Sequence, residues 1–198
     1  MISFAAKIPI AKCKIQNRET GKTEGATVYE YTCADKSDVE KIERIASKEN
    51  WEFGNDIFDD ASWKNSCIVN KDNSYGYMNN YCIYSIENNR RKTIGLCETR
   101  ESDNINVELF ETLQNKKYRF VGQVFLASLA KKASNSAKCL VIENAAKKAL
   151  GFYRNSCGFK KEFNEDEGIN FLVDAPQLED FIKQTEQRTN GKIVYLTA

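Results

Sequence analysis

The sequence contains no histidine among its 198 residues. This absence excludes Ser-His-Asp triads and Cys-His pairs, because both need an imidazole as the base. Acid–base chemistry must then rely on carboxylates, tyrosine, lysine, a cysteine thiol or water. The seven cysteines are scattered and form no CxxC pair. Without histidine and without that spacing, we expect no metal site.

An excess of one charge and long apolar runs are also missing. Lysine and arginine number 29 and the acidic residues 28, so the formal net charge is +1. A general nucleic-acid-binding protein would be strongly basic, and this balance argues against one. No run of about 20 apolar residues is present, and the N-terminal segment MISFAAKIPIAKCK has no basic region ahead of an apolar core. Cysteines inside apolar runs such as AKCLVIE indicate reduced, buried thiols, so we expect a cytoplasmic protein without membrane contact.

The spacing of the apolar residues predicts an α/β fold. KIPIAKCKIQ and ATVYEYTC alternate on either side of the polar turn NRETGKTEG, which predicts a β-hairpin over residues 7–33. Further strands are predicted at 81–87, 92–98, 105–113, 138–143, 169–174 and 192–197. Helices are predicted at 37–49, around 59–69, and at 121–133, 144–158 and 177–187. This order favours one domain over 27–174 with a mixed sheet, a hairpin extension over 1–26 and a helix–strand extension over 175–198.

Two short motifs lie inside this predicted domain. ALGFYRNSCGFKK, residues 149–161, places a tyrosine and then a Gly-Phe pair at the end of a predicted helix. TIGLC places a glycine after an apolar pair in a predicted strand, and a strand, a basic loop and a helix follow. In these segments the chain resembles the GNAT acyltransferase superfamily, roughly over residues 27–174. The resemblance implies a mixed, mostly antiparallel central sheet flanked by helices, with acetyl-CoA as co-substrate and an amine as acyl acceptor.

The loop KKYRFVGQ, residues 116–123, leads into a predicted helix. A helix N-terminus carries positive partial charge and unpaired N–H groups, which suit a pyrophosphate. In the family this loop reads [Q/R]-x-x-G-x-[G/A]. This pattern can be placed on the chain in two registers. If its first position is Arg119, Gly122 takes the place of the glycine. If its first position is Lys117, Phe120 takes the place of the glycine and Gly122 takes the last, small position. We prefer the Lys117 register, which requires the backbone of Phe120 to do what a glycine usually does.

Cofactor binding is therefore predicted on this loop and its neighbours. The predicted residues are Phe110, Thr112, Lys117, Arg119, Phe120, Val121, Gly122, Gln123, Val124 and Asn144. The loop would offer backbone N–H groups and cationic side chains, and Asn144 enters through the resemblance, as a position that contacts the cofactor. The alternative is a surface loop with a solvated basic run.

The catalytic residues are predicted mainly from the resemblance. A thiolate that leaves a thioester needs a proton, and the resemblance assigns Tyr153 as the general acid. The alternative is a core aromatic beside Phe152. For the base we favour Glu108 over Glu98 and Glu111, because a carboxylate inside an apolar strand is costly unless it is paired or functional. Paired structural carboxylates are the competing interpretation.

The acceptor side is expected at residues 37–80 and 160–172, where the superfamily builds it. Both segments are rich in acidic residues, which would suit a cationic amine and would equally suit a solvated surface. The alternative function is a catalytically silent GNAT-fold protein that binds CoA or a protein partner. The two extensions add edge strands, which can pair with another chain, so a homodimer is possible. A toxin that acylates aminoacyl-tRNA would need a basic face, which the short run RRK at 90–92 does little to supply.

Overall fold

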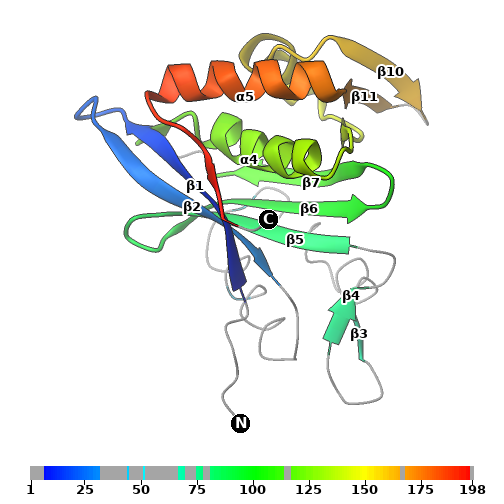
Figure 1. Ribbon diagram of the computed structural model, residues 1–198, viewed down its shortest axis with the longest axis horizontal. Coiled ribbons are helices and arrows are strands. Elements are labelled where there is room, and N and C mark those ends of the chain that lie inside the picture. The colour runs from blue at the N-terminus through cyan, green and yellow to red at the C-terminus, as the bar shows by residue number, and fades with distance from the viewer. Residues whose placement is uncertain are drawn as a thin grey trace.

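A ten-stranded sheet forms the centre of the computed structural model (Figure 1), which describes residues 7–31, 44, 51, 67–69, 75–77, 81–113, 117–165 and 168–196. The strands in spatial order are β10 (Lys161–Glu165), β11 (Gly168–Val173), β9 (Leu140–Ile142), β7 (Ile105–Thr112), β6 (Thr93–Glu101), β5 (Tyr81–Asn88), β2 (Thr23–Tyr31), β1 (Lys7–Asn17) and β12 (Val194–Tyr195). A tenth strand, β8 (Tyr118–Arg119), pairs with the end of β1. The β7–β9 pair is parallel and the other pairs are antiparallel. This is the mixed, mostly antiparallel sheet predicted from the sequence.

The two predicted extensions meet at one edge of this sheet. The hairpin β1–β2 confirms the prediction over residues 7–31, and residues 32 and 33 lie outside the described residues. β2 continues into the sheet by pairing with β5. β12 pairs with β1 at Ala11 and Lys12, and Figure 1 shows the chain running from α5 down to this edge. Ile15 and Val28 of the hairpin are fully buried in the main core. The hairpin therefore contributes to the same core as the rest of the sheet.

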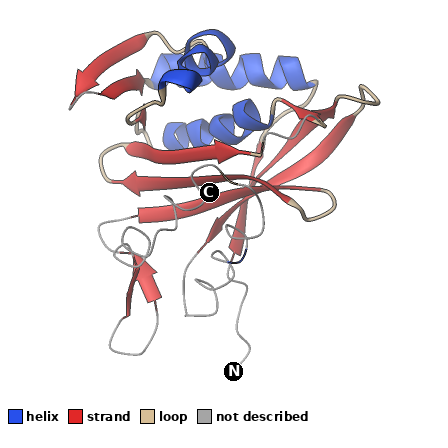
Figure 2. Cartoon of the chain, turned by 180° about the vertical axis from the view of Figure 1, so that it is seen from behind, coloured by secondary structure: helices blue, strands red, loops and turns tan. Residues whose placement is uncertain are grey.

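Two helices lie in layers on one face of the sheet. α4 (Val121–Asn135) packs against the strands, and α5 (Ala175–Thr189) packs over α4 (Figures 1 and 2). The predicted apolar stripe of α4 is buried, but so are Leu126 and Ala130, because α5 covers the outer side of the helix. Neither of these two helices, nor any other within the described ranges, is long and apolar enough to cross a membrane.

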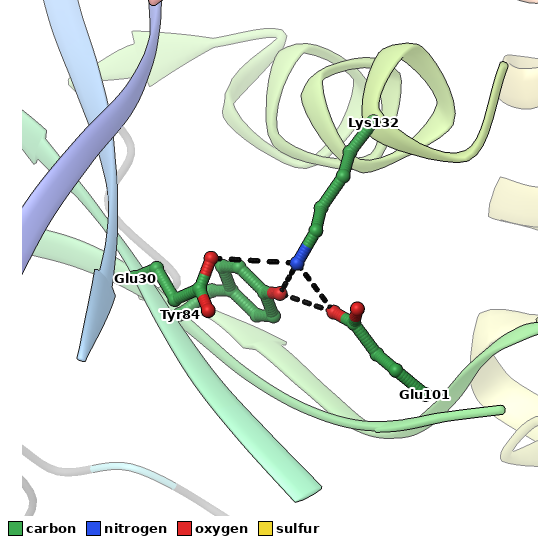
Figure 3. A network of polar contacts seen from close by, with 4 residues as sticks. All are labelled: Glu30, Tyr84, Glu101 and Lys132. Atoms are coloured by element: carbon green, nitrogen blue, oxygen red, sulfur yellow. Dashed lines mark hydrogen bonds and ion pairs between the residues drawn. The ribbon is translucent and has the colours of Figure 1, made fainter. Parts of the chain in front are cut away.

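A charged network ties the C-terminal half of α4 to the sheet (Figure 3). The Lys132 ammonium lies 3.3 Å from a Glu30 oxygen and 2.6 Å from a Glu101 oxygen, and it also donates to the Tyr84 hydroxyl. Tyr84 in turn donates to Glu101. Burial opposes the charge on Lys132, but the two carboxylates outweigh this effect and the pKa of Lys132 is raised. The network therefore joins α4 to β2, β5 and β6.

Four predictions need comment. The segment 144–158 is not one α-helix: it holds a single 3₁₀ turn, η1 (Lys147–Ala149), and then a π-helical turn, η2 (Phe152–Cys157), which Gly158 ends with φ 73° as predicted.

Tyr118–Arg119, predicted as loop, form β8 because β1 offers a free edge there. The helix predicted around 59–69 is wrong at its end, where Cys67–Val69 form β3 and pair with β4 (Tyr75–Tyr77). The helix predicted at 37–49 lies outside the described residues apart from Arg44.

Candidate functional site

A gap between β7 and β9 forms the first part of the site. The two strands pair in parallel from Ile105 with Leu140 to Val107 with Ile142, where β9 ends, whereas β7 continues to Thr112. The segment that follows β9 closes the gap on one side and leaves a mostly apolar cavity of about 590 Å³, the strand-gap cavity. Its lining comprises Val107, Glu108, Leu109, Phe110, Glu111, Thr112, Ile142, Glu143, Asn144, Ala145, Ala146, Lys148, Ala149, Phe152 and Tyr153.

A β-bulge lies where β7 leaves β9. Glu98 of β6 pairs with Leu109 and Thr99 pairs with Val107, so the ladder register skips Glu108. An extra residue of this kind bends its strand and re-aims its side chain. Glu108 lines the strand-gap cavity, so the bulge sets the direction from which this carboxylate faces the cavity.

The Arg100 guanidinium of β6 bridges two carboxylates of this cavity. Its Nε lies 3.1 Å from a Glu108 oxygen and its Nη2 lies 3.1 Å from a Glu143 oxygen. Because Glu143 directly follows β9, the arginine links three strands near the point of separation. Glu111, a weaker candidate for the base, also lines the cavity, whereas Glu98 is buried and does not. Glu108 is thus both a cavity residue and a member of an ion-pair network.

Tyr153 enters the strand-gap cavity from the π-helical turn. The residue is 5% exposed, and its ring lies 6.3 Å from that of Phe159 and 5.3 Å from that of Phe171 between centroids. Burial raises the pKa of the Tyr153 phenol well above its ordinary range, with smaller contributions from nearby cysteines. None of the described residues forms a hydrogen bond with its hydroxyl. Tyr153 therefore belongs to the core through its ring and also forms part of the cavity wall.

A second cavity of about 520 Å³, the loop cavity, lies at the start of α4. Its lining comprises Arg18, Thr112, Leu113, Tyr118, Arg119, Phe120, Val121, Gly122, Gln123 and Phe152. Thr112 and Phe152 line both cavities, so the two spaces adjoin. Arg18 and Arg119 are cationic, and of the described residues in this lining none is acidic.

The first turn of α4 presents backbone donors to the loop cavity. Phe120 precedes the helix with φ 67° and ψ 8°, the left-handed conformation that glycine adopts most easily. No side chain caps the helix and its first turn holds no acidic residue. The N–H of Val124 donates to Phe120 O at 2.9 Å, so it is not available to a ligand, contrary to our expectation. The N–H groups of Val121, Gly122 and Gln123 have no intrahelical acceptor at this end.

Gly122 allows close packing at the junction of the two cavities. A Cβ atom added at Gly122 would lie 2.8 Å from the Phe152 ring, which is too close for van der Waals contact. Phe152 stacks on Phe110 at 6.4 Å between centroids, and Phe110 contacts Phe125 of α4. The glycine therefore lets the helix start sit directly against the wall that both cavities share.

The basic loop is held by the N-terminal hairpin. Asn17 pairs with Tyr118 and Gln16 pairs with Arg119 between β1 and β8. The buried Tyr118 hydroxyl donates to Glu24 at 3.1 Å and accepts from Asn88 at 3.4 Å. These contacts fix the loop from the strands β1, β2 and β5.

Most of the predicted cofactor residues lie around the two cavities. Phe110, Thr112 and Asn144 line the strand-gap cavity, and Arg119 and residues 120–123 line the loop cavity. Asn144 has φ 46° and its N–H donates to the Asn170 side chain at 2.6 Å. Val124 is fully buried, and Lys117 lines neither cavity; its ammonium lies 5.9 Å from the centroid of the Tyr118 ring. Arg18 was not predicted, because nothing near it in the sequence indicates that the β1–β2 turn reaches this loop.

The expected acceptor segments are only partly described. Most of 37–80 lies outside the described residues, although Trp51 is buried. In 160–172, β10 and β11 form a hairpin. Glu162 of β10 forms an ion pair of 2.7 Å with Arg154 of the π-helical turn. That hydrogen-bonded pair lowers the pKa of the exposed Glu162. Over the described ranges, no three His, Cys, Asp or Glu side chains lie close enough to hold a metal ion.

Comparison with known proteins gives the fold. No protein-family model matches the sequence, and no curated protein matches it. A putative acetyltransferase structure from Exiguobacterium sp. 255-15 has 12% identity and a TM-score of 0.50 over 77% of this chain and 97% of its own. A GNAT-family acetyltransferase from Staphylococcus aureus Mu50 has 13% identity and a TM-score of 0.49 over 76% and 99%. PaiA N-acetyltransferase from Thermoplasma acidophilum, in complex with coenzyme A, has 12% identity and a TM-score of 0.48 over 73% and 97%.

The second and third of these structures are named as acetyltransferases and the first as a putative one, and their likeness to this chain concerns the backbone. The first of them supports the fold predicted from the sequence, a mostly antiparallel sheet flanked by helices. At 12% identity it shows the fold alone.

Proposed function

We propose that this protein is an acyl-CoA-dependent N-acyltransferase that moves an acetyl group from acetyl-CoA to a primary amine. The observation that carries the proposal is that two cavities of different chemistry adjoin at Thr112 and Phe152. One is cationic and lies at a helix N-terminus, and the other is mostly apolar and contains a buried tyrosine. Coenzyme A has the matching division, with phosphates at one end and a thioester at the other.

The loop cavity fits the diphosphate of coenzyme A. The N–H groups of Val121, Gly122 and Gln123 begin α4 without a side-chain cap or a nearby acidic residue, so an anion would satisfy them and the helix dipole. Arg119 adds positive charge in the same lining. Thr112 and Phe152 would border the arm that leads from the diphosphate into the strand-gap cavity.

The strand-gap cavity fits the transfer step. Acetyl-CoA supplies an acyl group activated as a thioester. The amine nitrogen forms the new C–N bond as the C–S bond breaks, so one proton must leave the amine and one must reach the sulfur. Tyr153 would give the second proton, because it lines this cavity and a phenol is protonated at neutral pH. A water or the Glu108 carboxylate would accept the proton that leaves the amine.

Binding of acetyl-CoA is the first test. At a concentration about 100 times the Kd, a ligand that binds only the folded state adds about 2.7 kcal/mol of stability. For a chain of this length, a gain of that size should raise the Tm by about 5 °C or more. Differential scanning fluorimetry with acetyl-CoA, against ATP at the same concentration as a control, would measure it. An unchanged Tm at millimolar acetyl-CoA would contradict the proposal.

Phe120 provides a test of the loop geometry. We expect Phe120→Gly to bind acetyl-CoA as tightly as the wild type, because glycine adopts the left-handed conformation without strain. Phe120→Val should weaken binding by about tenfold, since a β-branched residue is least tolerated at positive φ. Isothermal titration calorimetry of both variants would measure this. Equal affinities for the two variants would mean that the Phe120 backbone does not shape the site.

A catalytically silent protein that binds CoA is the second candidate. Its support is that Glu108, the favoured base, is already paired with Arg100. A thiol-release assay with saturating acetyl-CoA and a panel of polyamines, aminoglycosides and lysine-containing peptides separates the two. A thermal shift without thiol release across the panel would favour binding alone.

A further inference from the structure

The turn between β1 and β2 reaches the loop cavity. Arg18, the first residue after β1, lines this cavity together with Arg119. The two residues are about a hundred positions apart in the chain, and they meet because β8 pairs with the end of β1. The hairpin, which the sequence indicates only as an extension, thus forms part of the site's wall.

Two hydrogen bonds fix Arg18 at this position. Its backbone N–H donates to Lys117 O at 2.7 Å, and its side-chain Nε donates to Tyr118 O at 3.3 Å. Tyr118 is itself buried and bonded to Glu24 and Asn88. The backbone of Arg18 is therefore tied to the loop, and the Nε edge of its guanidinium faces Tyr118 O, although the residue as a whole is exposed.

The outer part of this guanidinium is available to a ligand. The Nε atom is used by Tyr118 O, but none of the residues the structure describes accepts a hydrogen bond from the two terminal NH₂ groups. The described lining of the loop cavity holds no carboxylate that would neutralise the charge. An arginine in this state suits a phosphate, which accepts two parallel N–H bonds from the planar fork.

We infer that Arg18 is a phosphate-binding residue of the acyl-carrier site, so that the N-terminal hairpin makes the site select a phosphorylated carrier. This inference rests on the proposed function, because it concerns the same carrier. The phosphate would be either the diphosphate or the 3′-phosphate of coenzyme A. Pantetheine, which has neither, would gain nothing from Arg18.

The test compares three ligands with three variants. Isothermal titration calorimetry would give Kd for coenzyme A, dephospho-coenzyme A and pantetheine with the wild type, Arg18→Met and Lys22→Met. Lys22 is the matched control, since it carries the same charge in the same turn but does not line the loop cavity. Urea unfolding would establish that each variant folds.

We expect Arg18→Met to raise the Kd for coenzyme A by roughly tenfold or more, as for a lost charge-assisted hydrogen bond, and to leave pantetheine unchanged. Lys22→Met should bind all three ligands like the wild type. A loss for coenzyme A alone assigns Arg18 to the 3′-phosphate, and an equal loss for dephospho-coenzyme A assigns it to the diphosphate. Arg18→Lys, which keeps the charge without the fork, should show a smaller loss and serves if Arg18→Met is unstable.

Two results would overturn the inference. One is an unchanged affinity of Arg18→Met for coenzyme A. The other is an equal loss for coenzyme A and pantetheine, which would mean that the arginine only maintains the shape of the loop. A wild-type protein that binds none of the three ligands would instead refute the proposed function.

Discussion

Replacing Tyr153 by phenylalanine is expected to lower kcat by about a hundredfold or more while leaving the Kd for acetyl-CoA nearly unchanged. The hydroxyl is the group proposed to protonate the departing sulfur, and general acids contribute about 10² to 10⁴ in rate. The ring, which packs against Phe159 and Phe171, is kept by the substitution. Thiol release under saturating conditions measures kcat, and calorimetry measures the Kd.

The pH profile gives an independent check on this tyrosine. Burial raises the pKa of Tyr153 well above its ordinary value, so the phenol stays protonated, and able to donate, to higher pH than an exposed tyrosine. The wild type should therefore show no fall in kcat from ionisation of Tyr153 up to about pH 10. A fall in kcat between pH 8 and 10 that Tyr153→Phe abolishes would contradict the burial argument.

A remote tyrosine provides the control. Tyr195 lies in the short edge strand β12 and lines neither cavity. Tyr195→Phe should retain wild-type kcat and Kd. Equal turnover by Tyr153→Phe and Tyr195→Phe would show that Tyr153 is not the acid. Tyr153→Phe should unfold at nearly the same urea concentration as the wild type, because the Tyr153 hydroxyl bonds to none of the described residues. Tyr195→Phe should do the same.

Replacing Lys132 by methionine should cost about 2 to 3 kcal/mol of folding free energy. The ammonium lies between Glu30 and Glu101 (Figure 3), and its removal leaves two carboxylates facing one another in a mostly buried space. Breaking a fully buried ion pair costs about 3 to 5 kcal/mol, and the partial exposure of this network reduces the figure. Urea denaturation would report it as a lower midpoint with an unchanged slope.

Two further variants identify the cause of that loss. Lys131→Met removes the neighbouring charge on α4, for which no ion pair is seen among the described residues, and should change stability little. Adding Glu101→Gln to Lys132→Met should recover part of the lost stability, because it removes one of the two opposed carboxylates. The loss of unfolding free energy caused by Glu101→Gln should be measured in the wild type and in Lys132→Met. If the two losses are equal, the network does not act as a unit.

The sign of the pH dependence follows from the raised pKa of Lys132. A group whose pKa is raised on folding stabilises the folded state below its unfolded pKa and loses that effect as the pH rises through the folded value. The difference between wild type and Lys132→Met should therefore stay constant near neutral pH and shrink only above about pH 10. Acetyl-CoA affinity should be unaffected in the folded variant, because the network lies at the other end of α4 from the loop cavity.

Local spacing was sufficient to predict most of the elements. The period of two in residues 7–33 predicted β1 and β2, and the helical period after Gly122 predicted α4. The loop pattern of the superfamily that the chain resembles, placed in the preferred register, also indicated Phe120 as the residue with an unusual backbone, and its φ of 67° agrees. These features depend on neighbours within a few positions, which is the range that sequence patterns report.

Only the tertiary structure decided how the site is assembled. It brought Arg18 to the basic loop through the β1–β8 pairing, and it placed the bulge at Glu108 where β7 leaves β9. It also showed that the segment around Tyr153, predicted as an α-helix, is a π-helical turn. The first two of these features depend on which strands lie side by side. Strand order is set by contacts between residues far apart in the chain, and such pairing produces no periodic pattern in either segment.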